Sequence, residues 1–151
     1  MTEASEKFAL PDSLATIAED FNALSEPDRL QLLLEFSEEL PELPEKYADH
    51  PGLLESVPEC QSPVFLVVDL DGDIVHPHVQ APREAPTTRG FASILVQGLD
   101  GLTAEQVLAV PGDYPSTLGL TRAVSLLRLN GMTGILARIK GQVRRKQRLG
   151  I

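Results

Sequence analysis

The sequence predicts the α+β fold class, in which a small antiparallel sheet is covered by helices. Apolar residues recur at three- and four-residue spacing before residue 41 and again after residue 88, which is typical of helices with one buried face. Between these parts, residues 63–70 form a valine-rich apolar run. An Asp-Gly turn follows at residues 71–73 and is a strong signal for a β-hairpin.

One domain is expected, because 151 residues can bury a single core and no internal repeat divides them. We place it at residues 12–147, between a flexible N-terminus at residues 1–11 and a basic tail at residues 148–151. No apolar stretch approaches the roughly 20 residues that a membrane helix needs, and no secretory signal is visible. The single cysteine cannot form an internal disulfide, so we expect a reducing, cytoplasmic location.

The net charge of −9 is unevenly distributed along the chain. Most acidic side chains precede residue 60, whereas residues 137–151 contain basic side chains and no acidic one. A basic segment can contact nucleic acid or a membrane surface, but cations also stabilise the last turn of a helix. Because the rest of the chain would repel phosphate, we expect the second role and neither nucleic acid nor membrane as a partner.

Two helices open the predicted domain. Apolar residues from Leu14 to Leu24 form one stripe on the first, and the second begins at Ser25, a residue type that caps helices, and stops at Pro41. Their short connection predicts an antiparallel pair. Residues 41–59 are rich in proline and indicate an irregular connector that leads to the strand at residues 63–70.

The second strand of the hairpin, residues 74–79, contains Pro77. Proline has no N–H to donate to a strand ladder, so this strand is expected to be an edge or to be interrupted. Helical periodicity then returns from Thr88 to about Leu99. A capping-box pattern at residues 103–106 opens a short helix.

The end of the chain predicts two further elements. A turn or short helix is expected near residues 114–118, and the last helix from about Asn130 to Gln147. Gly131 and Gly134 are placed near the start of that helix, because glycine costs about 1 kcal/mol in a helix interior.

Cys60 is the first candidate for chemistry. It lies at the mouth of the buried strand between Glu59 and Gln61, in polar and accessible surroundings, whereas a packing cysteine more often lies within an apolar run. A working thiol also needs a neighbour that favours the thiolate. Glu59 opposes this, while Gln61, Ser62 or an arginine from elsewhere could support it. The alternative is a small, half-buried structural residue.

Other kinds of site are weaker. His76 and His78 share one face of a strand and could bind zinc together with His50 and Cys60, but no specific metal-ligand spacing is present. One cysteine excludes a self-contained Cys-ligated iron–sulfur cluster. No phosphate-binding loop is visible, and no local signature favours a cysteine hydrolase.

Four landmarks follow one another along the chain: Glu39–Pro44, Cys60–Val64, Glu84 with Arg89-Gly90, and Arg128–Gly131. Together they make the sequence similar to the SufE-type sulfur acceptor proteins over roughly residues 12–146. The departures from the family pattern are Pro63 after the Cys-Gln-Ser triplet, Glu84 where the family has aspartate, and Ser125-Leu126-Leu127 before the arginine.

The resemblance implies a SufE/IscU-like fold and a sulfur carrier. Such proteins accept sulfur as a persulfide on the cysteine, here Cys60, from a PLP-dependent cysteine desulfurase of the SufS type, which they also activate. They pass it to an iron–sulfur cluster assembly scaffold of the SufBCD type. This chain would carry no cofactor, since PLP is on the partner, and would act as an accessory protein, a monomer or weak dimer, rather than an independent enzyme.

The resemblance also assigns roles to individual residues. Arg128 is expected to steady the loop or the sulfur anion, Gln61 and Ser62 to hold the loop geometry, and Glu84 and Arg89 to face the desulfurase. Two other functions stay open at this point: an allosteric activator in which Cys60 is incidental, and a redox-responsive thiol protein or thiol enzyme.

Overall fold

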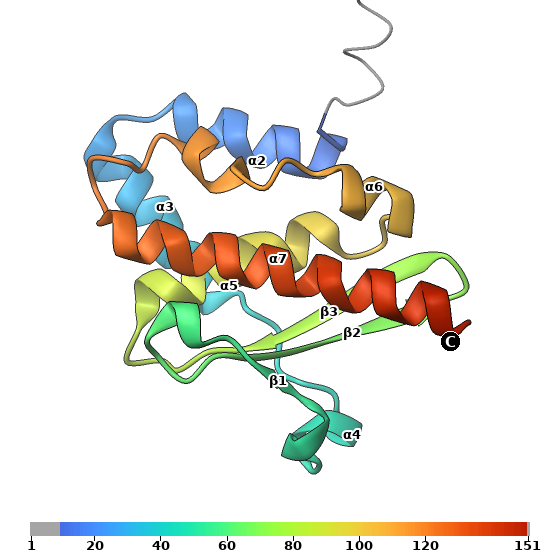
Figure 1. Ribbon diagram of the computed structural model, residues 1–151. Coiled ribbons are helices and arrows are strands. Elements are labelled where there is room, and N and C mark those ends of the chain that lie inside the picture. Colours follow the sequence, from blue (N-terminus) through green and yellow to red (C-terminus); the bar gives the residue numbers. More distant parts are fainter. Residues whose placement is uncertain (1–9, 151) are drawn as a thin grey trace, which may run out of the picture.

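The computed structural model describes residues 10–150 and confirms the α+β class. Three antiparallel strands, in the order β1-β2-β3, form the sheet. Figure 1 shows α7 running above the sheet, while α4 and its neighbours lie below it. The strands are β1 (Glu55–Ser56), β2 (Phe65–Asp71) and β3 (Ile74–Gln80).

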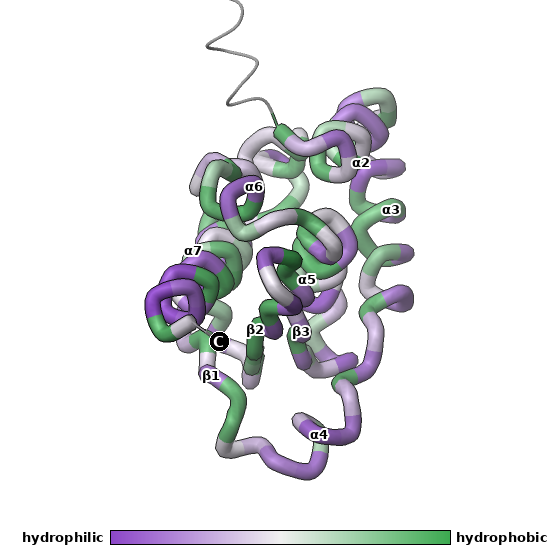
Figure 2. The backbone as a smooth tube through the Cα atoms, turned by 90° about the vertical axis from the view of Figure 1, so that its right-hand side faces the viewer, coloured by the Kyte–Doolittle hydropathy of each residue, from purple (hydrophilic) through white to green (hydrophobic). Residues whose placement is uncertain are grey.

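The helices form a layer in which α5 (Pro86–Leu99) is central. Figure 2 shows α7 (Leu126–Leu149) on one side of α5 and α3 (Glu26–Glu38) on the other. The hydrophobic positions gather between this layer and the sheet, and most of α5 is buried there. The expected antiparallel pairing of the first two helices is wrong. α2 (Asp12–Asn22) and α3 touch through the stacked rings of Phe21 and Phe36, and Arg29 donates to the carbonyl of Phe21, but each helix packs more extensively against α5 than against the other.

The hairpin is continuous, and Pro77 lies within β3 without breaking it. Val75, two residues earlier, directs its N–H to Leu102 and accepts from Gly101, at the outer edge of the sheet. Backbone groups two residues apart on a strand point to the same side. The N–H that Pro77 lacks would therefore point outward, as predicted for an edge strand.

The other edge of the sheet is covered by α7. β1 is so short that it leaves most of β2 without a strand partner on that side. The buried Gln142 accepts from the N–H of Val68 at 2.7 Å, and Lys146 donates to the carbonyl of the same residue. Side chains of one helix thus replace a strand, which fixes α7 against the sheet.

The start of α7 differs from the prediction. The helix begins at Leu126, so Gly131 and Gly134 lie in its interior and not at its start. It also continues to Leu149, so the first two residues of the expected tail at residues 148–151 are helical. The expected flexible segment, residues 1–11, lies almost wholly outside the described residues.

The short elements agree better with the sequence. The connector contains α4 (Glu45–Ala48) and η1 (Pro51–Leu53) and is otherwise irregular up to β1. The capping box of Thr103 and Gln106 opens α6 (Ala104–Ala109), and η3 (Tyr114–Leu118) lies where a turn or short helix was expected. No helix in residues 10–150 is long and apolar enough to cross a membrane.

Candidate functional site

Cys60 lies in a short loop that projects from the sheet edge. We call residues 58–63 the thiol loop; it contains the 3-10 turn η2 (Pro58–Cys60). The N–H of Val57 donates to the carbonyl of Val64 at 2.9 Å, and both of these side chains are buried. The base of the loop is therefore pinned to the core, while its tip lies outside the strand ladder.

The tip rests on two glycines of α7. A Cβ atom on Gly131 would lie 3.3 Å from Cys60 Sγ, and one on Gly134 would lie 2.8 Å from the Cβ of Glu59. The first separation would be tight, and the second is shorter than side chains tolerate, so the loop can approach the helix this closely only because Gly134 lacks a side chain. This contact explains why two residues that weaken a helix lie inside one.

An arginine on the same helix holds the loop through Glu59. Arg138 Nη2 and Nε lie 2.9 and 3.0 Å from one carboxylate oxygen of Glu59. Arg138 Nη1 lies 2.9 Å from Glu55 on β1, and Gln142 donates to the other oxygen of Glu55. The guanidinium thus joins the thiol loop, the sheet edge and α7.

The Cys60 thiol is half-buried and is held mainly in its protonated form. Its Sγ lies 3.5 Å from the carbonyl oxygen of Gly131, to which it donates. Burial, followed by the nearby Glu59 carboxylate, raises the pKa of Cys60 to about 11, and the Arg138 charge acts in the opposite direction. In this docked state the thiol is a poor nucleophile at neutral pH.

The structure brings together four residues that the sequence singled out. Cys60, Gln61, Ser62 and Arg128 line one pocket of about 200 Å³, with Thr88 of α5 and Leu127 of α7 completing it. Gln61 contributes through its backbone, because its φ of 57° is in the left-handed region and ends the 3-10 turn.

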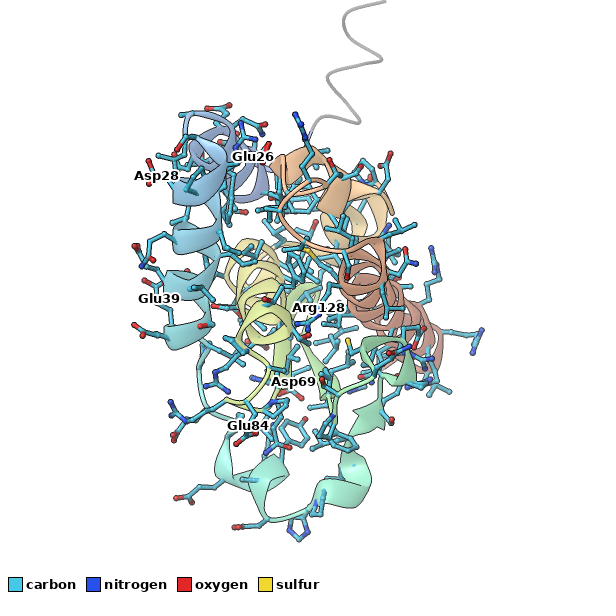
Figure 3. All side chains as sticks on the ribbon, turned by 90° about the vertical axis from the view of Figure 1, so that its left-hand side faces the viewer. Glu26, Asp28, Glu39, Asp69, Glu84 and Arg128 are labelled. Atoms are coloured by element: carbon cyan, nitrogen blue, oxygen red, sulfur yellow. The ribbon has the colours of Figure 1, made fainter. Side chains whose placement is uncertain are left out.

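The arginine whose charge acts on Cys60 in this arrangement is Arg138, not Arg128. Arg128 is exposed in the first turn of α7, at the helix end shown in Figure 3, and makes no ion pair among the described residues. The sequence offered one signal for Arg138 that was missed. Positions 131, 134 and 138 lie on one face of a helix, so the spacing predicts a face with two glycines followed by an arginine.

Glu84 and Arg89 lie apart from the thiol pocket. Glu84 is exposed in the turn before α5, and Figure 3 shows it near the base of the molecule. Arg89 donates to the carbonyls of Ser37 and Ala81 at 2.9 and 2.6 Å, so its side chain ties α3 to the segment after β3. Whether either residue faces a partner stays a prediction.

The histidines of β3 are each paired with an aspartate. His76 lies 2.7 Å from Asp100, and His78 lies 3.1 Å from Asp69, which also accepts from Tyr47. Across residues 10–150, no group of three or more histidine, cysteine or acidic side chains is arranged to hold a metal ion.

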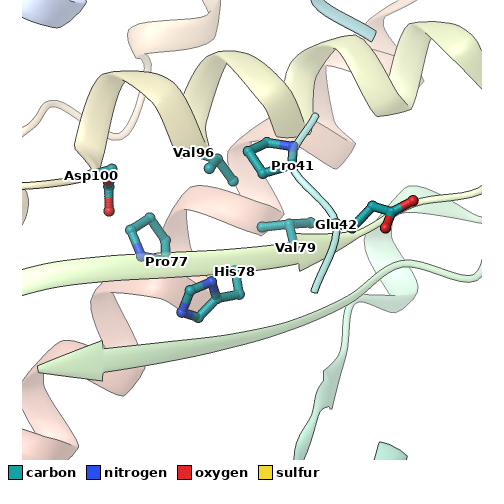
Figure 4. A pocket seen from close by; sticks show the side chains of 7 residues that line it. All are labelled: Pro41, Glu42, Pro77, His78, Val79, Val96 and Asp100. Carbon is teal, nitrogen blue, oxygen red and sulfur yellow. The ribbon is translucent and has the colours of Figure 1, made fainter. Parts of the chain in front are cut away.

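A second pocket, of about 140 Å³, opens between β3 and α5. Figure 4 shows that prolines and valines form most of its wall. Because it contains none of Cys60, Gln61, Ser62 and Arg128, we do not connect it with the thiol.

Comparison with known proteins gives a consistent result. The model of the SufE family, described as the Fe-S metabolism associated domain, matches residues 15–143. SufE-like proteins of two Mycobacterium tuberculosis strains are each 53% identical over 137 residues, covering 90% of this chain and 94% of theirs. A cysteine desulfuration protein SufE of Plasmodium vivax is 31% identical over 84 residues, 54% of this chain and 34% of its own. The solution structure of a hypothetical protein from Thermus thermophilus superimposes with a TM-score of 0.80 and 37% identity, covering 93% of this chain and 99% of that one.

Proposed function

This chain belongs to the SufE family of Fe-S metabolism associated domains, and from that premise we propose that it carries sulfur on Cys60. The donor is a PLP-dependent cysteine desulfurase of the SufS type, whose turnover the chain stimulates. The acceptor is an iron–sulfur assembly scaffold of the SufBCD type. The chain acts as an accessory protein, and the PLP stays on the desulfurase.

The proposed transfer is an exchange at sulfur. The Cys60 thiolate attacks the terminal sulfur of a persulfide on the desulfurase cysteine, forming a new S–S bond. The S–S bond within the desulfurase persulfide breaks, and that cysteine leaves as a thiolate. Cys60 loses its proton to solvent or to the leaving thiolate, and no external oxidant or reductant is needed.

The single observation that carries the proposal is the placement of the thiol. Cys60 lies on a loop whose base is pinned and whose tip rests on α7 without strand pairing. Such a tip can move outward without unfolding the sheet, and a nucleophile must reach into the active site of a second protein. A loop of this kind meets that requirement.

The surroundings of the loop also suit a protein partner. Leu126 and Leu127 begin α7 beside the thiol pocket, and 73% and 51% of their surfaces are exposed. Exposed leucines of this size commonly mark a protein interface when they cluster. A desulfurase that delivers sulfur to Cys60 would cover them.

The alternative of a redox-responsive thiol makes a different prediction. A sensor cysteine needs an accessible thiolate and would be alkylated rapidly without any partner, whereas the half-buried Cys60, whose pKa is raised by burial and by Glu59, should be alkylated slowly until a desulfurase binds. The second alternative, a purely allosteric activator, is distinguished from a sulfur carrier by the following experiment.

The test measures desulfurase turnover with wild-type protein and with Cys60→Ser. A sulfur acceptor loses its stimulation in Cys60→Ser while binding to the desulfurase persists, because only the sulfur atom is removed. Stimulation that survives the substitution would show that Cys60 is incidental and would leave the allosteric activator. Ser56→Ala, an equally small change at an exposed position of β1 four residues before Cys60, is the matched control and should retain stimulation.

A further inference from the structure

The ion pair between Arg138 and Glu59 is the main polar restraint on the thiol loop. Within the described residues, the side chains of the loop make two polar contacts with the rest of the protein. One is the 3.5 Å contact between Cys60 Sγ and Gly131, which is weak because a thiol is a poor donor. The other is the pair between Arg138 and Glu59, in which two guanidinium nitrogens reach one carboxylate oxygen.

We propose that Arg138 is a positioning residue for the thiol: its pair with Glu59 holds the thiol loop on α7, and opening of the pair releases Cys60. Under the proposed function, a released thiol can reach a sulfur donor. The biological role of the release therefore rests on that function, whereas the release itself can be tested without a desulfurase.

Arg138 is itself fixed from the opposite side. Its Nη1 contacts Glu55 at 2.9 Å, and Glu55 is in turn held by the buried Gln142 at 2.9 Å. Arg138 therefore keeps a partner when Glu59 leaves, and the part that moves is the loop and not the arginine. This asymmetry makes the contact reversible.

Two further features favour release. Gln61 adopts a φ of 57°, which is unfavourable for a residue with a side chain, so the docked loop stores strain. Side-chain exposures of 29% for Arg138 and 40% for Glu59 show that water already reaches the pair. A pair of this kind is weak enough to open without large energy input.

A purely electrostatic role for Arg138 predicts the opposite result. The charged groups facing Cys60 are Glu59 on the loop and Arg138 and Arg128 on α7, while α5 contributes the uncharged Thr88. If the loop did not move, removing the Arg138 charge would disfavour the thiolate and slow its reactions. If Arg138 holds the loop, its removal exposes the thiol and accelerates them.

The experiment measures alkylation of Cys60 by iodoacetamide at pH 8 in the full-length protein, without any partner. Arg138→Met and Glu59→Gln should each accelerate alkylation by about 1.5-fold to fivefold, the range for loss of a partly exposed ion pair. The double variant should add little to either single one, because both remove the same contact. Arg138→Lys, which keeps the charge, should lie between wild type and Arg138→Met.

Hydrogen exchange supplies a readout that charge alone does not move. The amides of Cys60 and Gln61 are bonded within the loop, and their exchange should quicken in both variants. Arg122→Met removes another arginine, whose pair with Glu26 lies far along the chain from the loop, and should change neither readout. Circular dichroism confirms that each variant is folded.

Slower alkylation of Arg138→Met with unchanged exchange would overturn the proposal and leave only a charge effect. Unchanged alkylation in both single variants would overturn it as well. These outcomes are separate from the proposed function. Sulfur transfer from a desulfurase to a wild-type Cys60 would stand if the loop proved indifferent to Arg138, and loop release would stand if no sulfur were transferred.

Discussion

Two helices of this protein use glycine for close packing, but they pack against different kinds of partner. On α5, a Cβ on Gly90 would lie 2.5 Å from the backbone carbonyl oxygen of Leu33, and one on Gly98 would overlap the side chain of Leu14. Leu14 and Leu33 are completely buried. On α7, Gly131 and Gly134 face Cys60 and Glu59 in a loop that is partly exposed.

The comparison shows that glycine in a helix can permit close packing for two different purposes. Around α5, glycine permits a permanent contact between core helices, where neither side can yield. Around α7, it permits a loop to dock without strand pairing, held by an ion pair that water reaches. The first contact stabilises the fold, and the second controls access to a thiol.

The largest expected effect is at the core contact. Gly90→Ala forces the new methyl group against backbone of α3, which cannot move away without opening the core. We expect a loss of about 3 kcal/mol in the free energy of unfolding, measured by urea denaturation. A loss well below 1 kcal/mol would show that α3 and α5 slide apart easily and that the contact is not permanent.

The next effect concerns the pH dependence of the thiol. Because burial and Glu59 raise the pKa of Cys60 to about 11, the reactive thiolate is a small fraction between pH 7 and pH 9. The rate of alkylation by iodoacetamide should rise about tenfold for each pH unit over that range. A rate that levels off near pH 8.5, as for a free cysteine, would mean that the loop is already undocked.

The smallest effects separate two glycines of the same helix. Gly134→Ala should displace the loop, since a Cβ there would lie 2.8 Å from Glu59, and should accelerate Cys60 alkylation by about tenfold if the contact contributes roughly 1.4 kcal/mol. The gain in helix propensity, about 1 kcal/mol, should offset much of the cost in stability.

Gly141→Ala is the matched control for that substitution, because a Cβ there would meet nothing within 4 Å. It should stabilise the protein by about 0.5–1 kcal/mol and leave alkylation unchanged. Equal alkylation rates in the two alanine variants would contradict the docking of the thiol loop on Gly134.

Sequence reasoning succeeded where the signal was local. The Asp-Gly turn, the edge position of Pro77 and the capping box of Thr103 each depend on neighbours a few residues away. Cys60 was singled out in the same way, from the polar residues beside it, and its function stays a prediction. The family resemblance then supplied the fold, and the match to residues 15–143 confirmed it.

It failed where distant residues decide the outcome. Gly131 and Gly134 lie inside a helix because a loop about 70 residues earlier packs on them. Helix propensity is a property of single residues and carries no information about such a distant contact. The choice of Arg138 over Arg128 depends on the same docking. The short connection between the first two helices predicted that they pack on each other, but in the structure both have their main contacts with α5.

The most direct test of the central claim is the intact mass of the protein after incubation with a cysteine desulfurase and cysteine. Wild type should gain the mass of one or more sulfur atoms, and a reducing agent should remove it. Cys60→Ser should gain nothing. A wild-type protein that gains no reducible sulfur while the desulfurase turns over would contradict the account, as would equal sulfur on Cys60→Ser.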